Sequence, residues 1–190
     1  MWLETTPFAV RRTVLALAGA LLLTGLTGPA PTSAAPVALT SLMASPAQGT
    51  WRTLNGTEVT IAPCAEGLCG TLSWVVIPKK NAEQCRATDK QTFASLMLDY
   101  SNPDKALQTR PILGLNILTL KPTSDPTSFT VKVYNPEDGS TNDAQLFIMN
   151  GNNTLRIGGG CLGTMCVQSQ DWPRVPDRPD APNFTCEGGQ

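Results

Sequence analysis

Short runs of alternating apolar and polar residues fill most of the chain beyond residue 48. Val59 and Ile61, for example, alternate with Glu58 and Thr60, as expected of a strand that buries one face. Asn-Gly or Asp-Gly dipeptides lie between several of these runs and favour the tight turns of antiparallel hairpins. The pattern predicts about eight strands, near residues 49–54, 57–63, 69–77, 112–120, 128–134, 142–149, 154–160 and 166–172.

Residues 78–110 interrupt this pattern, because they are polar and lack strand periodicity. A long insertion in a compact β domain is usually a functional loop or a cap over one end. We expect it to be irregular or partly helical, with one or two helical turns within Thr92–Asp99.

Eight antiparallel strands in one domain can form a sandwich or close into an up-and-down barrel. Gly49-Thr50-Trp51 opens the first strand and Arg174 follows the last, which resembles the Gly-x-Trp and distant Arg of lipocalin-like barrels. In that arrangement the indole blocks the barrel floor and the guanidinium stacks on its face. We therefore predict an all-β, single antiparallel up-and-down barrel. The alternative is an ordinary core aromatic at Trp51 and a solvated Arg174.

Six cysteines occur, and four of them form two pairs that each enclose four residues including a glycine. Such an insert suits a hairpin loop, where facing residues are close enough for a disulfide. Two local bridges leave only one further pairing. The sequence thus predicts the disulfides Cys64–Cys69, Cys161–Cys166 and Cys85–Cys186. A zinc site made from the four thiolates of the two local pairs is the alternative.

The first residues have the pattern of an export signal. Arg11 and Arg12 precede an uncharged apolar run, Thr13–Leu26, which is too short to span a bilayer and is followed by small residues. We expect a signal peptide and spacer over 1–38, and no membrane span after processing. The mature protein would be periplasmic or secreted, where cysteines form disulfides.

The domain organisation follows from these boundaries. A linker is expected over 39–48, the β-barrel domain over 49–175 with the insertion 78–110, and a Pro-rich tail over 176–190.

Composition narrows the function classes. The chain has 190 residues, no histidine and a formal net charge of -1. Without histidine, the usual catalytic triads and most catalytic zinc sites are not available. No cluster of Lys and Arg indicates nucleic-acid binding. The sequence predicts neither a cofactor nor a metal.

Several motifs in fixed order resemble a known family of exported bacterial proteins, the domain of unknown function 2147. They are Gly49-Thr50-Trp51, Ile61-Ala62-Pro63-Cys64, Leu68-Cys69-Gly70, Asn102-Pro103-Asp104, Arg110-Pro111-Ile112-Leu113-Gly114-Leu115, Tyr134-Asn135-Pro136-Glu137-Asp138-Gly139, Gly160-Cys161-Leu162-Gly163 and Ser169-Gln170-Asp171-Trp172-Pro173-Arg174. The resemblance covers about 49–175 and implies a lipocalin-type barrel with no established activity. This chain departs from the pattern at Asn135, where Asp is usual, and at Asn142, where an aromatic is usual.

The leading hypothesis is a binding module, since an eight-stranded barrel can hold one small ligand or be filled by side chains. The candidate lining consists of Trp74, Phe129, Val131, Leu146 and Ile148, with Asp99, Arg110 and Tyr134 near the mouth. The alternative is a structural or interaction protein of the cell envelope whose barrel core is filled.

The insertion 78–110 is predicted to form a lid over the open end, opposite the end plugged by Trp51. Arg110 would lie where the lid joins the next strand and could hold a carboxylate or phosphate. The competing interpretation pairs Arg110 with Asp99 or Asp104 in a structural salt bridge.

An enzyme is the least favoured hypothesis. Asp99 and Asp104 could act as an acid and a base only if their environments separated their pKa values. Turn formation explains them equally well. Oxygen atoms that could bind calcium occur close together in the sequence, at Asn135, Glu137, Asp138 and Asp143. These residues fit no ordered calcium-binding loop.

Overall fold

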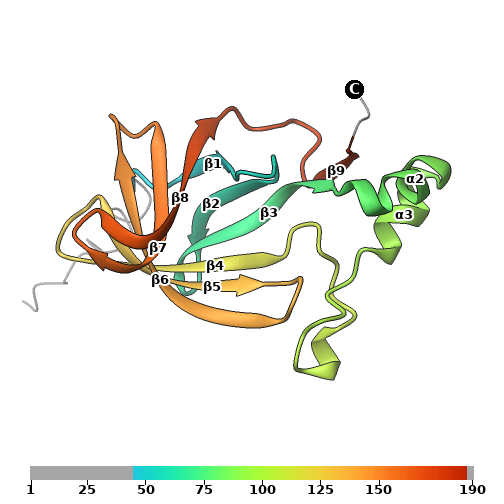
Figure 1. Ribbon diagram of the computed structural model, residues 1–190, viewed down its shortest axis with the longest axis horizontal. Helices are drawn as coiled ribbons and strands as arrows, with labels where there is room; N and C mark the ends of the chain where they lie inside the picture. Colours follow the sequence, from blue (N-terminus) through green and yellow to red (C-terminus); the bar gives the residue numbers. More distant parts are fainter. Residues whose placement is uncertain (1–44, 188–190) are drawn as a thin grey trace, which may run out of the picture. The chain divides into compact units, whose positions relative to one another are not determined.

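The structure, a computed structural model, describes residues 45–187 (Figure 1). Its strands are β1 (Gly49–Arg52), β2 (Glu58–Cys64), β3 (Gly67–Ile77), β4 (Asn116–Pro122), β5 (Ser128–Asn135), β6 (Ser140–Met149), β7 (Thr154–Leu162), β8 (Met165–Val175) and β9 (Asn183–Cys186). Two α-helices, α2 (Lys79–Ala87) and α3 (Lys90–Leu96), and a 3-10 turn, η1 (Lys105–Leu107), lie between β3 and β4. None of the helices formed by residues 45–187 has the length and apolar character needed to cross a membrane.

The first eight strands close into the predicted up-and-down antiparallel barrel. Each strand pairs with the next along the chain, and β1 also pairs with β8. The closing ladder places Trp51 opposite Arg174 and Thr50 opposite Val175. Closure removes the free edges that an open sheet would expose at this seam. A sandwich is thereby excluded.

The strand prediction over 112–120 is wrong at its start, because β4 begins only at Asn116. Residues 112–115 instead make a turn, in which the Leu115 N–H donates to the Ile112 carbonyl over 3.1 Å. Gly114 has a φ of +79°, a left-handed conformation that suits glycine and interrupts a strand.

The insertion is partly helical, as expected, but it contains more helix than the sequence suggested. Helix α3 begins before Thr92, and the Asp89 side chain caps it by accepting the Thr92 N–H over 2.9 Å. Helix α2 was not expected. Its sequence is polar and buries only Ala82 and Cys85, so it lacks the apolar stripe by which sequence patterns reveal helices.

The chain beyond residue 175 carries β9, which pairs in parallel with Trp74–Ile77 of β3. This strand, α2 and α3 share a small second core made of Ile77, Cys85, Phe93 and Phe184. Figure 1 shows β9 between the barrel and the two helices. The segment expected only as a Pro-rich tail therefore joins the insertion to the barrel.

The main core fills much of the barrel interior. Phe129, Val131, Leu146 and Ile148 are buried in it and pack together, and none of them lines the pocket at the open end of the barrel. Val131 also borders a groove on the barrel wall. The prediction that these four residues line a ligand pocket inside the barrel is therefore wrong. The reason is that their large apolar side chains, which alternate inward from neighbouring strands, fill this part of the barrel.

The three predicted disulfides are present: Cys64–Cys69, Cys85–Cys186 and Cys161–Cys166. All cysteines of the described residues are therefore oxidised, and the zinc alternative is excluded. Two bridges hold the β2–β3 and β7–β8 hairpins. The third ties α2 to β9 across a sequence separation of 101. The predicted signal peptide and spacer over 1–38, and residues 39–44 of the predicted linker, lie outside the described residues.

Candidate functional site

One end of the barrel is closed by Trp51. The side chain is fully buried, and its indole N–H donates to the Ala47 carbonyl over 2.8 Å. The Arg174 guanidinium lies 4.1 Å from the indole centroid, which is the contact that the sequence predicts. Its N–H groups donate to three backbone carbonyls, of Pro46, Gln48 and Asn152, over 2.6–2.7 Å. This end leaves no opening for a ligand.

The opposite end holds a pocket of about 550 Å³, which we call the mouth pocket. Up-and-down connectivity brings the β1–β2 turn, the β5–β6 turn and the chain around the insertion to this end. Most of its wall is apolar, and the apolar lining includes Leu72, Val75, Ile112, Ile117, Val133 and Trp172. Pro78 and Leu98 of the insertion border it, and Asn135, Glu137 and Gln170 supply polar groups. An apolar pocket with a few polar groups is typical of small-molecule sites.

Tyr134 forms part of the wall of the mouth pocket and is held from behind by a polar cluster. Its hydroxyl donates to Asp99 Oδ1 over 2.5 Å and accepts the Asn102 amide over 2.9 Å. Asp99 is completely buried, and its Oδ2 accepts from Arg110 Nη2 over 2.6 Å and from Asn102 Nδ2 over 2.9 Å. Arg110 also lies 5.9 Å from the Tyr134 ring centroid. The cluster fixes the orientation of the ring.

The titration of this cluster follows its hydrogen bonds. Burial by itself raises the pKa of Asp99, but hydrogen bonds from Tyr134, Arg110 and Asn102 outweigh it and lower that pKa below its ordinary 3.8. Burial and the neighbouring Asp99 carboxylate raise the pKa of Tyr134 above 10.0. Asp99 is therefore an anion and Tyr134 a neutral phenol at neutral pH, so the phenol can donate.

Arg110 forms a salt bridge with Asp99, as the competing interpretation of the sequence predicts. Neither Arg110 nor Asp99 lines the mouth pocket. The Nε–H of Arg110 is the single buried side-chain nitrogen or oxygen of residues 45–187 without a hydrogen-bond partner. These two residues reach the pocket only through Tyr134.

Trp74 does not line the mouth pocket, contrary to its place in the expected lining. It stands opposite Glu58 in the β2–β3 ladder, and the Arg178 guanidinium lies 4.1 Å from its ring centroid. The chain beyond residue 175 covers the ring, and the sequence pattern of β3 gives no sign of that cover. Trp172 is the tryptophan that lines the pocket, and the polar, exposed residues before it in β8 gave no periodic signal of that role.

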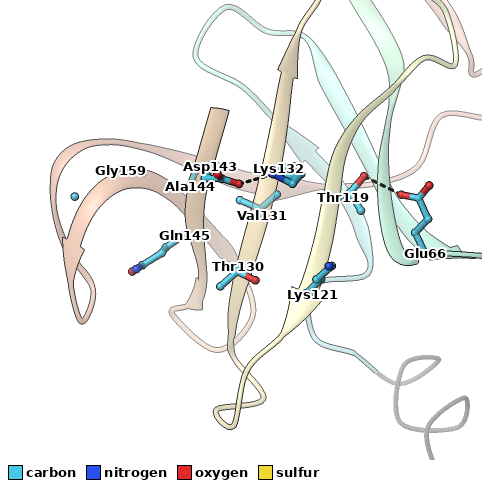
Figure 2. Close-up of a pocket in the computed structure, with 12 residues that line it drawn as sticks. Glu66, Thr119, Lys121, Thr130, Val131, Lys132, Asp143, Ala144, Gln145 and Gly159 are labelled. Atoms are coloured by element: carbon cyan, nitrogen blue, oxygen red, sulfur yellow. Dashed lines mark hydrogen bonds and ion pairs between the residues drawn. The ribbon is translucent and has the colours of Figure 1, made fainter. Parts of the chain in front are cut away.

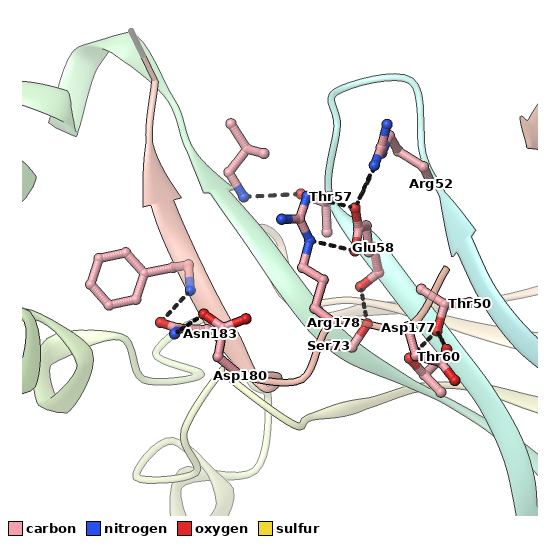
Figure 3. A network of polar contacts seen from close by, with 12 residues as sticks. Thr50, Arg52, Thr57, Glu58, Thr60, Ser73, Asp177, Arg178, Asp180 and Asn183 are labelled. Carbon is pink, nitrogen blue, oxygen red and sulfur yellow. Dashed lines mark hydrogen bonds and ion pairs between the residues drawn. The ribbon is translucent and has the colours of Figure 1, made fainter. Parts of the chain in front are cut away.

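A second polar cluster surrounds Glu58 on the outer side of β2 (Figure 3). The carboxylate is buried and receives donors from both Arg52 and Arg178 over 2.9–3.2 Å. Burial alone raises the pKa of Glu58, but the two arginines outweigh it and the pKa is lowered from 4.5. Nearby, Asp177 accepts from the Thr50 hydroxyl over 2.5 Å. Because all these partners are internal, the cluster fastens residues 177 and 178 to the barrel.

A groove of about 560 Å³ lies over strands β4 to β7, chiefly between outward-facing side chains (Figure 2). Lys132 and Asp143 bridge it at 2.9 Å, and Thr119 donates to Glu66 over 3.5 Å. The Lys132 and Asp143 side chains are largely exposed. An exposed ion pair is worth little and organises no ligand site.

The carboxylates considered for catalysis or calcium have local partners. Asp104 caps η1 by accepting the Ala106 N–H over 2.9 Å, so it makes no acid–base pair with Asp99. Asn135 and Asp138 accept backbone N–H groups within their own turn, from Glu137 and Ser140. Within residues 45–187, no three Asp, Glu, Cys or His side chains are grouped to hold a metal ion.

The chain resembles known proteins in sequence and in structure. Residues 49–174 match a family described as "Uncharacterized protein conserved in bacteria (DUF2147)". The chain belongs to this family. No curated protein matches the sequence. Among solved structures, it is similar to protein HP1028 from Helicobacter pylori, which is described as belonging to the lipocalin family. The two share 18% identity with a TM-score of 0.49, over 69% of this chain and 84% of the other.

Proposed function

We propose that this DUF2147 protein binds a small, largely apolar molecule in the mouth pocket. The observation that carries the proposal is a pocket of about 550 Å³ with a mostly apolar wall at the one end of the barrel that Trp51 does not close. Burial of apolar ligand surface there would supply the binding free energy, at about 25 cal/mol per Å². Tyr134 would contact the ligand, while Asp99 and Arg110 position its ring.

The insertion 78–110 acts as the lid in this proposal. Pro78 and Leu98 border the pocket, whereas the helices that lie between them pack mainly in the second core. The lid could therefore shift at the pocket without disturbing the barrel core. Binding takes place outside the cytoplasm, an inference supported by the three disulfides. Cell fractionation of the tagged full chain tests this location, and cytoplasmic recovery of the folded protein would contradict it.

The binding test uses 1-anilinonaphthalene-8-sulfonate, a fluorescent apolar probe. Trp172 lines the pocket, so saturable probe binding should quench its emission. Val133→Phe places extra volume in the pocket wall and should weaken probe binding by about tenfold, which is about 1.4 kcal/mol. Leu107→Phe also enlarges an apolar side chain, but on η1, outside the mouth pocket, and should leave binding unchanged.

Native mass spectrometry of the protein purified from its natural compartment completes the test. A co-purifying molecule that is present in Leu107→Phe and reduced in Val133→Phe would identify the ligand class. Equal probe affinity in both variants, with no adduct in either, would contradict the proposal. The envelope protein with a filled core, which acts through its surface, would then be the better interpretation.

A further inference from the structure

The two hairpins with local disulfides differ sharply in what their apolar residues contact. In the β2–β3 hairpin, Leu68 is 0% exposed and pairs with Leu120 of β4. In the β7–β8 hairpin, Leu162 and Met165 form a cross-strand pair and are 81% and 73% exposed. A local disulfide thus stabilises both hairpins, but the apolar side chain of the first is buried in the barrel wall, whereas those of the second are exposed to solvent.

Val167 extends the uncovered surface of the β7–β8 hairpin. It is 86% exposed, and its Cγ2 lies 3.1 Å from the position of a Cβ built on Gly160, across the ladder. Leu162, Met165 and Val167 thus gather within six positions of the chain. Single exposed apolar residues are ordinary, but such a cluster indicates an interaction site. We call Leu162, Met165 and Val167 the hairpin patch.

The backbone next to the hairpin patch also lacks a strand partner on one side. Strand β8 pairs with β7 along most of its length, but with β1 only at Arg174 and Val175. Within residues 45–187, the second edge of Met165–Ser169 therefore pairs with no strand. Proteins usually protect such an edge with Lys, Pro or an inward charge, and this stretch contains none of them.

The absence of charge points to the partner. No Asp, Glu, Lys or Arg occurs between Ile157 and Asp171 in a chain with 15% charged residues. In a two-fold symmetric contact the same surface meets itself, so a charged residue would face its own like charge. A neutral edge is compatible with its own copy. A membrane contact fits less well, because residues 158–170 contain no Lys, Arg, Trp or Tyr to anchor them at a lipid interface.

We propose that two copies of this chain associate through antiparallel pairing of their β8 edges over Met165–Ser169, with the hairpin patch buried between them. Added backbone hydrogen bonds would supply affinity, and Met165 and Val167 would supply apolar burial. The contact surface is short, which places the dimer among weak, concentration-dependent associations.

Sedimentation velocity of the disulfide-intact protein over a wide concentration range tests the proposal. The unaltered chain should show a reversible monomer–dimer equilibrium. Val167→Lys places two like charges at the pairing edge and should raise the dimer dissociation constant more than about tenfold. Leu96→Lys is the matched control, because Leu96 is 49% exposed on α3, outside both the hairpin patch and the mouth pocket. It should leave dimerisation unchanged.

Amide hydrogen exchange locates the contact. Protection of Met165–Ser169 should increase with protein concentration in the unaltered chain and not in Val167→Lys. Far-UV circular dichroism and a thiol assay verify that both variants keep their fold and disulfides. A monomer at all concentrations, or a dimer that Val167→Lys leaves intact, would overturn the proposal. So would a monomer that binds phosphatidylglycerol vesicles through the hairpin patch, since the partner would then be a lipid surface.

Discussion

The two ends of the barrel each place an arginine beside an aromatic ring, and the two pairs behave differently. At the closed end, Arg174 lies 4.1 Å from the centroid of a fully buried Trp51. At the open end, Arg110 lies 5.9 Å from the centroid of Tyr134, whose ring is half-buried beside the mouth pocket.

The acceptors of the two arginines explain the difference. Arg174 donates to three backbone carbonyls from two chain segments, residues 46–48 and Asn152, so it ties both segments to the end of β8. Arg110 is held by one carboxylate, Asp99, which also orients Tyr134. Backbone carbonyls do not titrate, whereas a carboxylate does. The closed end is therefore held by hydrogen bonds to groups that do not titrate, and the open end has an acid-sensitive support.

Loss of the closed end should have the largest effect. Trp51→Ala removes a fully buried indole and should lower the free energy of unfolding by about 3–5 kcal/mol, as measured by urea denaturation. Trp74→Ala is the control, because the Trp74 ring is only half-buried and should matter less. Probe affinity per folded molecule should stay unchanged in Trp51→Ala. Equal losses in the two variants would show that Trp51 is no more than an ordinary aromatic.

Removal of the open-end carboxylate should have an intermediate effect. Asp99→Asn weakens the hydrogen bonds to Tyr134 and Arg110 and should lower the free energy of unfolding by about 1–3 kcal/mol at neutral pH. Because the pKa of Asp99 is lower in the folded protein than its ordinary 3.8, its contribution is present above that pH. The contribution is lost as the pH falls through the lower folded value.

The unfolding free energies of the unaltered chain and Asp99→Asn should therefore converge in acid. Glu58 also has a lowered pKa, so the total stability of both proteins will fall, and only their difference isolates Asp99. A difference that stays constant from neutral pH into acid would mean that Asp99 supports the open end without its charge.

Loss of the Tyr134 hydroxyl should have the smallest effect. Tyr134→Phe keeps the ring in the pocket wall and removes one donor to Asp99, so the free energy of unfolding should change by about 1 kcal/mol or less. Probe affinity should stay within about threefold, since the apolar wall is retained. A large loss of affinity would assign the ligand contact to the hydroxyl and indicate a more polar ligand.

Local patterns were sufficient to predict the strands of the barrel and its two hairpin disulfides. Alternation of the kind seen at Val59 and Ile61 predicts half-buried strands, and equal cysteine spacings predict the two hairpin bridges. The distant pairing of Trp51 with Arg174 follows once the barrel closes. The site was less predictable. Tyr134 lines the pocket and Asp99 supports it, but Trp74 and the four core residues assigned to the lining lie elsewhere.

The misplaced residues share a physical reason. Alternation shows which side chains point inward, but not how far along the barrel axis the core is filled. Phe129 and Val133 lie in the same strand and alternate identically, yet one is packed in the core and the other lines the pocket. The depth of a cavity depends on side chains from all strands together.

The sequence by itself predicted the barrel strands and the cysteine pairs, because these depend on local periodicity, on spacing and on elimination, and the resemblance to lipocalin-like barrels predicted the closing tryptophan and arginine. Only the tertiary structure decided which residues on the outer side of the barrel become buried. Glu58 alternates like a solvent-exposed residue but is buried, because Arg178 reaches it from a segment 120 positions away. Val167 of β8, by contrast, remains 86% exposed. Which of two similar surfaces gains a partner depends on where distant chain segments pack, and no local pattern encodes that.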